Sequence, residues 1–442
     1  MKHILLSLSA ALLLGAASAA EPAYDSDDLK LEGMLAPMKD SADEGDLAAM
    51  RQVYLHYGFA GKQEQAQAWA QKFLGTLRGR AEQGDVAAMS NLGRAYLAGD
   101  ACITPDPVQA AAWLSRASAQ GDAPSAYMLG EMLMQQNNEA DAKVAYARAY
   151  GLFRQRAESG DKDARYWQGY MELRGVGTEK PEQPDALLRS MVGEEHLPAA
   201  YQLFKYAAEQ GDDETALLCA RLLADKGQDP QMAYYVATAA YEGKGMEQDN
   251  ATAERYLQQA ADAGVPAALY HRAWQLEEAG KDADAFRLFS EAAAAGHEHA
   301  PVKAGVMLLE GRGCEKDEAT GLQYLQRAAD VQQSPFAAWE LARHYAAIGE
   351  RDLADSYIIS ASDRGLDAAM ARRGLLHLIP ASGVDWSPTE AYRWWTRGAD
   401  SGDADCRLYL RLYLYLFIPL LVLLVFAGPM LAARLLLKRE KM

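Results

Sequence analysis

The sequence lacks the compact motifs that usually mark a catalytic or metal site. Its four cysteines form no C-x-x-C pair, and no H-E-x-x-H, Gly-x-Ser-x-Gly or Gly-Lys-Ser/Thr phosphate-loop motif occurs. The densest histidine cluster, His297-Glu298-His299, has no further ligand tied to it by spacing. We therefore expect neither a cofactor nor a metal, and we expect that the protein is not an enzyme.

Basic residues and runs of β-branched residues are also scarce. The 442 residues include 44 Lys and Arg against 61 Asp and Glu, which gives a formal net charge of −17. Such a balance excludes a phosphate-backbone-binding surface as the main function, so we expect no nucleic-acid partner. It is compatible with cationic protein partners, or simply with solubility. Abundant Ala with few β-branched runs favours an all-α fold.

A short turn motif recurs along most of the chain. Between Ala81 and Gly99, a glycine suited to ending one helix is followed by an aspartate suited to capping the next. Ala88, Leu92, Gly93 and Tyr96 then provide one packing face. Equivalent turn glycines are expected at Gly45, Gly84, Gly121, Gly160, Gly211, Gly264, Gly296, Gly365 and Gly402.

The spacing of these turns indicates repeated helical hairpins. The first three intervals are 39, 37 and 39 residues, and a period of this size predicts a solenoid. Between Gly296 and Gly365 lie 69 residues, with a glycine-free turn expected at 332–335. Two longer units are expected between Gly160 and Gly264, and prolines make 178–230 irregular, with an atypical or inserted helix.

A second signature separates the two helices of a unit. It is a Gly-x-Gly pair followed by an aspartate, as in Gly243-Lys-Gly245 with Asp249 and Gly311-Arg-Gly313 with Asp317. With these motifs the chain resembles the Sel-one-like repeat family, relatives of tetratricopeptide repeats, over residues 41 to about 410. The resemblance implies a right-handed superhelical solenoid of antiparallel helix pairs, with about nine or ten repeats. It also implies a binding scaffold, often secreted or membrane-associated.

Both ends of the chain have membrane-related patterns. Residues 1–20 read as a signal peptide and 21–40 as a lead-in with a partial cap helix near 28–39. Residues 411–433 include 22 uncharged residues from Leu412 to Ala433, enough for a transmembrane helix, and 434–442 form a basic tail. The charge asymmetry predicts a single-pass type I protein of the bacterial inner membrane, with a periplasmic solenoid and a cytoplasmic C-terminus.

The same register predicts a partner-binding groove. In tetratricopeptide-like solenoids the first helices line the inner surface, and positions two before and two after Leu92 are expected to point into it. The corresponding residues are Arg51, Ser90, Arg94, Tyr127, Glu131, Tyr166, Tyr170, Tyr270, Trp274, Trp339 and Arg343. Aromatic residues and Arg are favoured binding anchors, although Tyr and Trp could equally fill gaps in an Ala-rich core.

The register also places the cysteines. Cys219 and Cys406 occupy expected core positions, whereas Cys102 and Cys314 occupy equivalent loops in distant repeats, too far apart to form a disulfide.

These patterns predict a membrane-anchored periplasmic scaffold for protein partners of the cell envelope, in assembly, secretion, polysaccharide export or signalling. Its short tail would require a membrane-embedded partner to receive any signal. Two alternatives remain open: an envelope enzyme acting on cell-wall glycan, and an adaptor of the endoplasmic-reticulum membrane in protein quality control.

Overall fold

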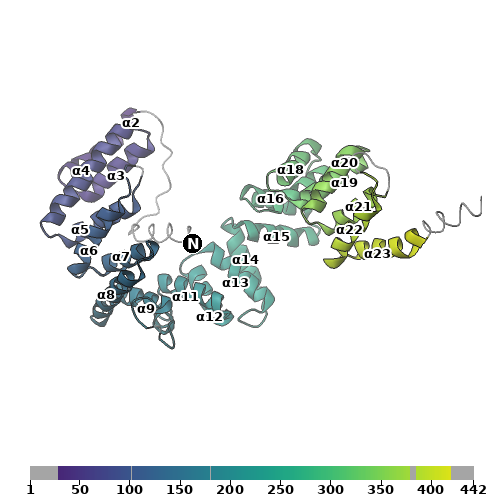
Figure 1. Ribbon diagram of the computed structural model, residues 1–442. Helices are drawn as coiled ribbons and strands as arrows, with labels where there is room; N and C mark the ends of the chain where they lie inside the picture. The colour runs from purple at the N-terminus through teal and green to yellow at the C-terminus, as the bar shows by residue number, and fades with distance from the viewer. Residues whose placement is uncertain (1–27, 101, 180, 379–384, 420–442) are drawn as a thin grey trace, which may run out of the picture. The chain divides into compact units, whose positions relative to one another are not determined.

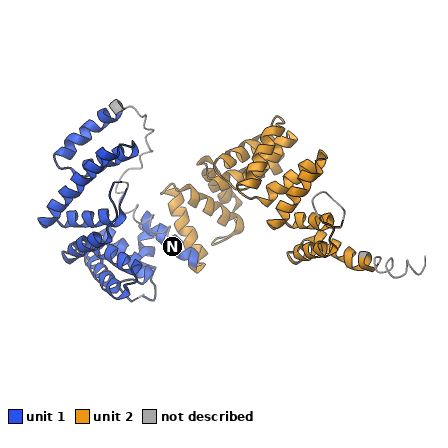
Figure 2. Cartoon of the chain, turned by 45° about the horizontal axis from the view of Figure 1, so that its top comes forward, with its two compact units in different colours: residues 1–209 blue, residues 210–442 orange. Residues whose placement is uncertain are grey.

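The computed structural model describes residues 28–100, 102–179, 181–378 and 385–419. Within these ranges the chain forms 22 α-helices and one π-helical turn, without β-strands (Figure 1). The all-α solenoid predicted from the repeats is confirmed. The chain divides into two units, residues 1–209 and 210–442, which are coloured separately in Figure 2.

The N-terminal unit begins with a cap helix and continues as helical hairpins, most of whose helices have 13 residues. Consecutive helices such as α3 and α4, α5 and α6, and α7 and α8 pack as pairs. The helices are α2 (Asp28–Asp43), α3 (Leu47–Phe59), α4 (Gln63–Glu82), α5 (Val86–Ala98), α6 (Pro107–Ala119), α7 (Ala123–Gln135), α8 (Glu139–Glu158), α9 (Lys162–Arg174), α10 (Ala186–Val192) and α11 (Leu197–Gln210).

The C-terminal unit repeats the same hairpin and ends in a helix that continues toward the apolar segment. Its helices are α12 (Asp213–Asp225), α13 (Pro230–Glu242), α14 (Asn250–Asp262), α15 (Pro266–Glu278), α16 (Asp282–Ala294), α17 (Ala300–Glu310), α18 (Glu318–Asp330), α19 (Pro335–Ala347), α20 (Arg351–Asp363), α21 (Asp367–Leu376), α22 (Pro388–Asp400), α23 (Ala404–Leu412) and the π-helical turn η1 (Tyr413–Phe417).

The predicted Gly-Asp turns are confirmed. All nine turn glycines have positive φ, between 73° and 103°, a conformation that glycine adopts without a Cβ penalty. The Asp85 carboxylate accepts a 3.0 Å hydrogen bond from the Ala88 amide at the start of α5. At the glycine-free turn, Ser334 caps α19 instead, and Gln333 takes the positive φ.

Small residues allow the two helices of a hairpin to approach closely. Ala88, Leu92 and Tyr96 are buried on one face of α5, as their spacing predicts. A Cβ at Gly93 would lie only 2.7 Å from a methyl carbon of Leu114 on α6. The α5–α6 crossing therefore requires glycine at this position, and the buried aliphatic face supplies the hydrophobic stabilisation.

The irregular region contains six helices, α9 to α14, between Gly160 and Gly264. Three of them lie on each side of Gly211, so each of the two longer intervals contains three helices instead of two. The atypical element is α10, which has only seven residues and follows the proline-containing segment 181–184.

The two ends correspond only in part to the predicted segments. The cap helix is α2, while the predicted signal peptide lies outside the described residues, as do 420–433 of the predicted span and the basic tail. No helix in the described parts of the chain combines the length and the apolarity needed to cross a bilayer. Helix α23 continues into η1 without an interruption. Pro419 explains the wider turn, because it cannot donate a backbone hydrogen bond to residue 415.

Candidate partner-binding surfaces

The eleven predicted groove residues have different environments. Ser90, Tyr127 and Tyr170 are buried, whereas Trp274 and Arg343 are exposed and the others are half-buried. The buried ones have almost no side-chain surface for a partner. Each unit is described separately below.

Ser90 belongs to a polar link between consecutive repeats of the N-terminal unit. Its hydroxyl donates to Asp122, the N-cap of α7, at 3.0 Å and accepts from Ser125 at 2.9 Å. Arg94 donates to the same hydroxyl at 3.1 Å, and burial lowers the pKa of this guanidinium. Because the serine side chain is short, it ends inside the packing between α5 and α7 rather than in a groove.

Tyr127 and Glu131 form a second polar link, between α7, α8 and α9. Tyr146 donates to Glu131 at 2.6 Å, and Arg174 donates to Glu131 at 2.7 Å and to the Tyr127 hydroxyl. Burial raises the pKa of Tyr127, whose ring centroid lies 5.2 Å from that of Trp167. These contacts use the polar atoms of Tyr127 and Glu131 to hold repeats together.

The remaining predicted residues of this unit are Tyr166, Tyr170 and Arg51. The Tyr166 and Tyr170 rings stack with centroids 6.3 Å apart, and His196 lies 5.5 Å from Tyr166. Burial raises the pKa of Tyr166 to about 12. Arg51 is half-buried beside the Tyr54 hydroxyl, which donates to Asp100 at 2.7 Å. Of this group, Tyr166 and Arg51 retain side-chain surface for a partner.

The C-terminal unit presents a partly exposed run of rings, which we name the C-terminal aromatic surface. It consists of Tyr270, Trp274, His297, His299 and Phe336. Tyr270 and Trp274 share one face of α15, and the Tyr270 ring stacks on His297 with centroids 4.2 Å apart. His299 meets Phe336 edge-on at 5.8 Å. Trp274 is 44% exposed and Phe336 50% exposed, so both have free apolar surface.

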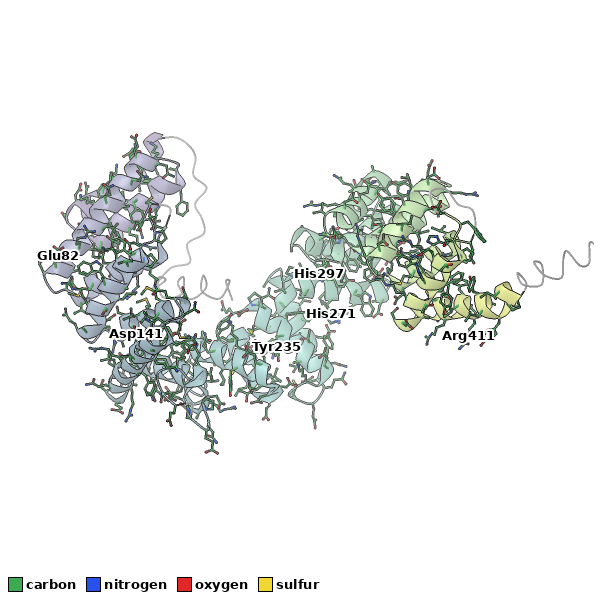
Figure 3. The ribbon with its side chains drawn as sticks, in the orientation of Figure 1. Glu82, Asp141, Tyr235, His271, His297 and Arg411 are labelled. Carbon is green, nitrogen blue, oxygen red and sulfur yellow. The ribbon has the colours of Figure 1, made fainter. Side chains whose placement is uncertain are left out.

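The rings of this surface come from three successive repeats. Tyr270 and Trp274 belong to α15, the two histidines precede α17, and Phe336 is the second residue of α19. Figure 3 labels His271 and His297 on the ribbon of this unit. Tyr270 also packs on buried Phe289 of α16, with centroids 5.4 Å apart. The aromatic surface is thus supported from beneath by the core.

Trp339 and Arg343, the remaining predicted positions, lie on α19 farther from its start. Trp339 is half-buried against the core cluster that includes Leu341. Arg343 is exposed and pairs with Glu340 at 2.8 Å. Trp339 therefore serves mainly in packing, while Arg343 is accessible.

A charge cluster fixes the repeats that carry the aromatic surface. Glu277 of α15 accepts hydrogen bonds from Lys303 of α17 at 2.8 Å and from Arg312 at 2.7 Å. Its side chain is only 14% exposed. Burial alone would raise the pKa of Glu277, but the two cationic donors hold it below its ordinary value.

Sequence reasoning missed His297, His299 and Phe336 as surface residues. His297 follows a turn glycine, at the position where other repeats have a capping aspartate. Helix α17 begins only at Ala300, three residues after His297, and the His297 ring stacks on Tyr270. A histidine replacing the repeated aspartate was the signal that could have identified this site.

The polar groups of the described residues contain no cluster typical of a metal site. Among the residues that the structure describes, no group of three His, Cys, Asp or Glu side chains is placed to hold a metal ion. Cys219 and Cys406 are buried, as predicted, whereas Cys102 and Cys314 are half-buried. The arrangement offers aromatic stacking, hydrogen bonding and apolar contact.

Comparison with known proteins identifies the repeat. The Sel1 repeat model matches residues 86–122, 197–212, 230–265, 281–297, 302–331 and 367–403. These six segments match the Sel1 repeat and together cover less than half of the chain. The matches at 86–122, 230–265 and 367–403 each cover a complete hairpin, α5–α6, α13–α14 and α21–α22. The match at 302–331 covers α18 and all of α17 except its first two residues.

Solved structures of Sel1-type proteins are similar to this chain. A protective antigen of uropathogenic Escherichia coli with an SLR fold is 23% identical, with a TM-score of 0.55, over 86% of this chain and 82% of the antigen. A Sel1 repeat protein from Oxalobacter formigenes is 18% identical, with a TM-score of 0.36, over 62% of this chain and 96% of that protein. The first likeness supports the Sel1-type solenoid fold.

Proposed function

We propose that the protein is a scaffold that binds a protein partner through the C-terminal aromatic surface. The observation that carries this proposal is the exposure of Trp274 and Phe336 beside stacked Tyr270 and His297. Exposed aromatic rings are the side chains most often found as binding hot spots. Sel1 repeats, as in other helical solenoids, are compatible with such a role.

The surface is pre-organised for binding. Phe289 supports Tyr270 from the core, and the Glu277 ion pairs hold α15 against α17. A rigid surface loses little conformational entropy when a partner binds. Because Trp274 and Phe336 present apolar area, the matching partner segment would contribute apolar or aromatic side chains.

Photo-crosslinking from the surface tests this proposal. A photoreactive amino acid is placed at position 274 or 336 of the full chain in its native cells, and at Val331 as a control. Val331 is also exposed but lies at the end of α18. We expect the same polypeptide to be captured from 274 and 336 and not from 331. Identical capture patterns from all three positions would contradict a specific surface.

We also propose that residues 411–433 anchor the scaffold in the bacterial inner membrane, with the repeats in the periplasm. The support is the 22-residue uncharged segment and the Arg434, Lys438, Arg439 and Lys441 tail that follows it. In that location the scaffold would serve an envelope assembly, secretion, polysaccharide-export or signalling complex.

Reporter fusions test the topology. A C-terminal fluorescent protein that matures only in the cytoplasm is expected to fluoresce, and alkaline phosphatase fused after residue 403 is expected to be active in the periplasm. The reverse pattern would contradict the proposed orientation, and a full chain that does not sediment with membranes would contradict the anchor.

A further inference from the structure

The end of the solenoid is packed against the beginning of the apolar segment. Trp395 of α22 contacts Tyr409 and Tyr413, with ring centroids 5.7 and 5.8 Å apart. The ring centroids of Tyr392 and Tyr413 lie 6.1 Å apart. Cys406 of α23 is buried. Tyr413, the first residue beyond α23, is therefore held on the last hairpin. The apolar segment leaves the solenoid from a fixed position.

The rest of α23 and the following turn η1 present an exposed stripe of mixed character, named the α23 stripe below. Leu408, Arg411, Leu412 and Tyr415 are all exposed, and their spacing of three to four residues places them along one side of the helix. Figure 3 labels Arg411 on α23. Leu408 is 52% and Tyr415 76% exposed. The stripe combines apolar surface, a phenol ring and a guanidinium.

We infer that this α23 stripe lies in the phospholipid headgroup layer of the membrane; the inference rests on the proposed anchor at 411–433. Tyrosine favours the boundary between headgroups and hydrocarbon, because its ring is apolar and its hydroxyl is polar. The Arg411 guanidinium can donate paired hydrogen bonds to a lipid phosphate. Leu408 and Leu412 cover the apolar side of the same layer.

The dimensions agree with this placement. Seven residues separate Leu408 from Tyr415, which corresponds to about 10 Å along a helix at about 1.5 Å per residue. The headgroup layer of one leaflet is about 5–8 Å thick. A helix entering the membrane there would place Arg411 among the phosphates and Tyr415 at the hydrocarbon boundary. The stripe therefore also sets the depth and direction in which the solenoid meets the membrane.

Spin-label depth measurement on the full chain tests the inference. Cys102 and Cys314 are changed to Ser, whereas buried Cys219 and Cys406 remain. Single cysteines replace Leu408, Tyr415, Phe426 in the proposed span, or Val331 as an aqueous control. The labelled proteins are reconstituted in phosphatidylcholine vesicles containing phosphatidylglycerol, and power saturation with oxygen and a nickel chelate reports depth.

The expected result is a graded series of depths. The label at 426 lies in hydrocarbon, that at 415 at its boundary, that at 408 among the headgroups, and that at 331 in water. Aqueous labels at 408 and 415 with 426 in hydrocarbon would overturn the inference and leave the anchor standing. An aqueous label at 426 would overturn both. If the labels at 408 and 415 are shielded from both reagents, the headgroup inference is overturned, because a protein then covers the stripe.

A charge variant tests the contact with phosphate. Arg411→Gln is expected to move the 408 label toward water, because it removes the cationic donor. Arg393→Gln is the matched control, since Arg393 is exposed on α22 and pairs with Glu390. It is expected to leave the depth unchanged. Equal depths in both variants and the parent would overturn the assignment of Arg411 to a phosphate.

Discussion

Glu277 is the residue that most directly joins the repeats of the C-terminal aromatic surface. Its carboxylate accepts from Lys303 and Arg312, both of which come from the next repeat. Exposed ion pairs contribute little to stability, but a mostly buried carboxylate with two cationic donors is costly to replace. The pair of contacts therefore stabilises the α15–α17 arrangement.

Replacing Glu277 with Gln is expected to lower the free energy of unfolding by about 1–3 kcal/mol, because two cationic donors lose their charged acceptor. Glu291→Gln is the control, since Glu291 pairs with Arg287 at an exposed site. That change is expected to cost about 0–1 kcal/mol. Urea unfolding of both variants provides the comparison, and equal losses would contradict a special role for Glu277.

The shifted pKa of His297 predicts that the stability of the protein depends on pH. Burial against Tyr270 and the neighbouring His299 lower its pKa, while Glu298 opposes the shift. Below about pH 6.5 the unfolded chain therefore binds more protons than the folded chain, and stability falls as the pH decreases.

The expected outcome is a smaller pH slope in a His297→Gln variant than in the parent between pH 7.5 and 5.5. Chemical unfolding across this range measures the slope. Equal slopes in the two proteins would show that His297 does not contribute.

At the scale of elements, the Gly-x-Gly loop reverses the chain and also packs closely against a neighbouring helix. Gly313 has a φ of +73°, and a Cβ there would lie 2.2 Å from the Asp282 carbonyl oxygen at the start of α16. Gly280 has a similar φ of +71°, but no atom lies within 4 Å of its Cβ position. Gly280 therefore requires glycine only for its positive φ, whereas Gly313 requires glycine for its positive φ and for its close contact with α16.

Gly280→Ala is expected to cost about 1–2 kcal/mol, because alanine is strained at positive φ. Gly313→Ala is expected to cost about 1–3 kcal/mol more, since the added methyl group also collides with backbone. Thermal or urea unfolding measures the difference. If the two variants are equally stable, the loop does not require close contact with α16.

The sequence predicts these elements well where the chemistry is local. Positive φ at glycine and capping by aspartate depend on neighbouring residues, so Gly84 and Asp85 could be assigned in advance. Side-chain direction across repeats depends on tertiary partners. Ser90 was therefore predicted in a groove although it bonds Asp122, and His297 was not predicted to stack on Tyr270.

At the scale of the whole molecule, each unit is a series of hairpins whose helices mainly contact their neighbours. In such repeats, stability is approximately a sum of local and nearest-neighbour contributions. The polar links at Ser90, Glu131 and Glu277 each connect nearby repeats in this way. The period of the turns was enough to predict this architecture. The short helix α10 could not be predicted, because the proline-containing segment before it has no repeat pattern.

The scaffold function depends on whether the exposed aromatic rings bind a partner. The most direct measurement is the affinity of the full chain for the polypeptide crosslinked from positions 274 and 336. The Trp274→Ala and Phe336→Ala double variant is expected to bind more than about 100-fold more weakly, since hot-spot aromatics contribute about 2 kcal/mol or more each. Val331→Ala should bind as the parent does, with the same helicity in all three proteins. Unchanged affinity in the double variant would contradict the proposed binding surface.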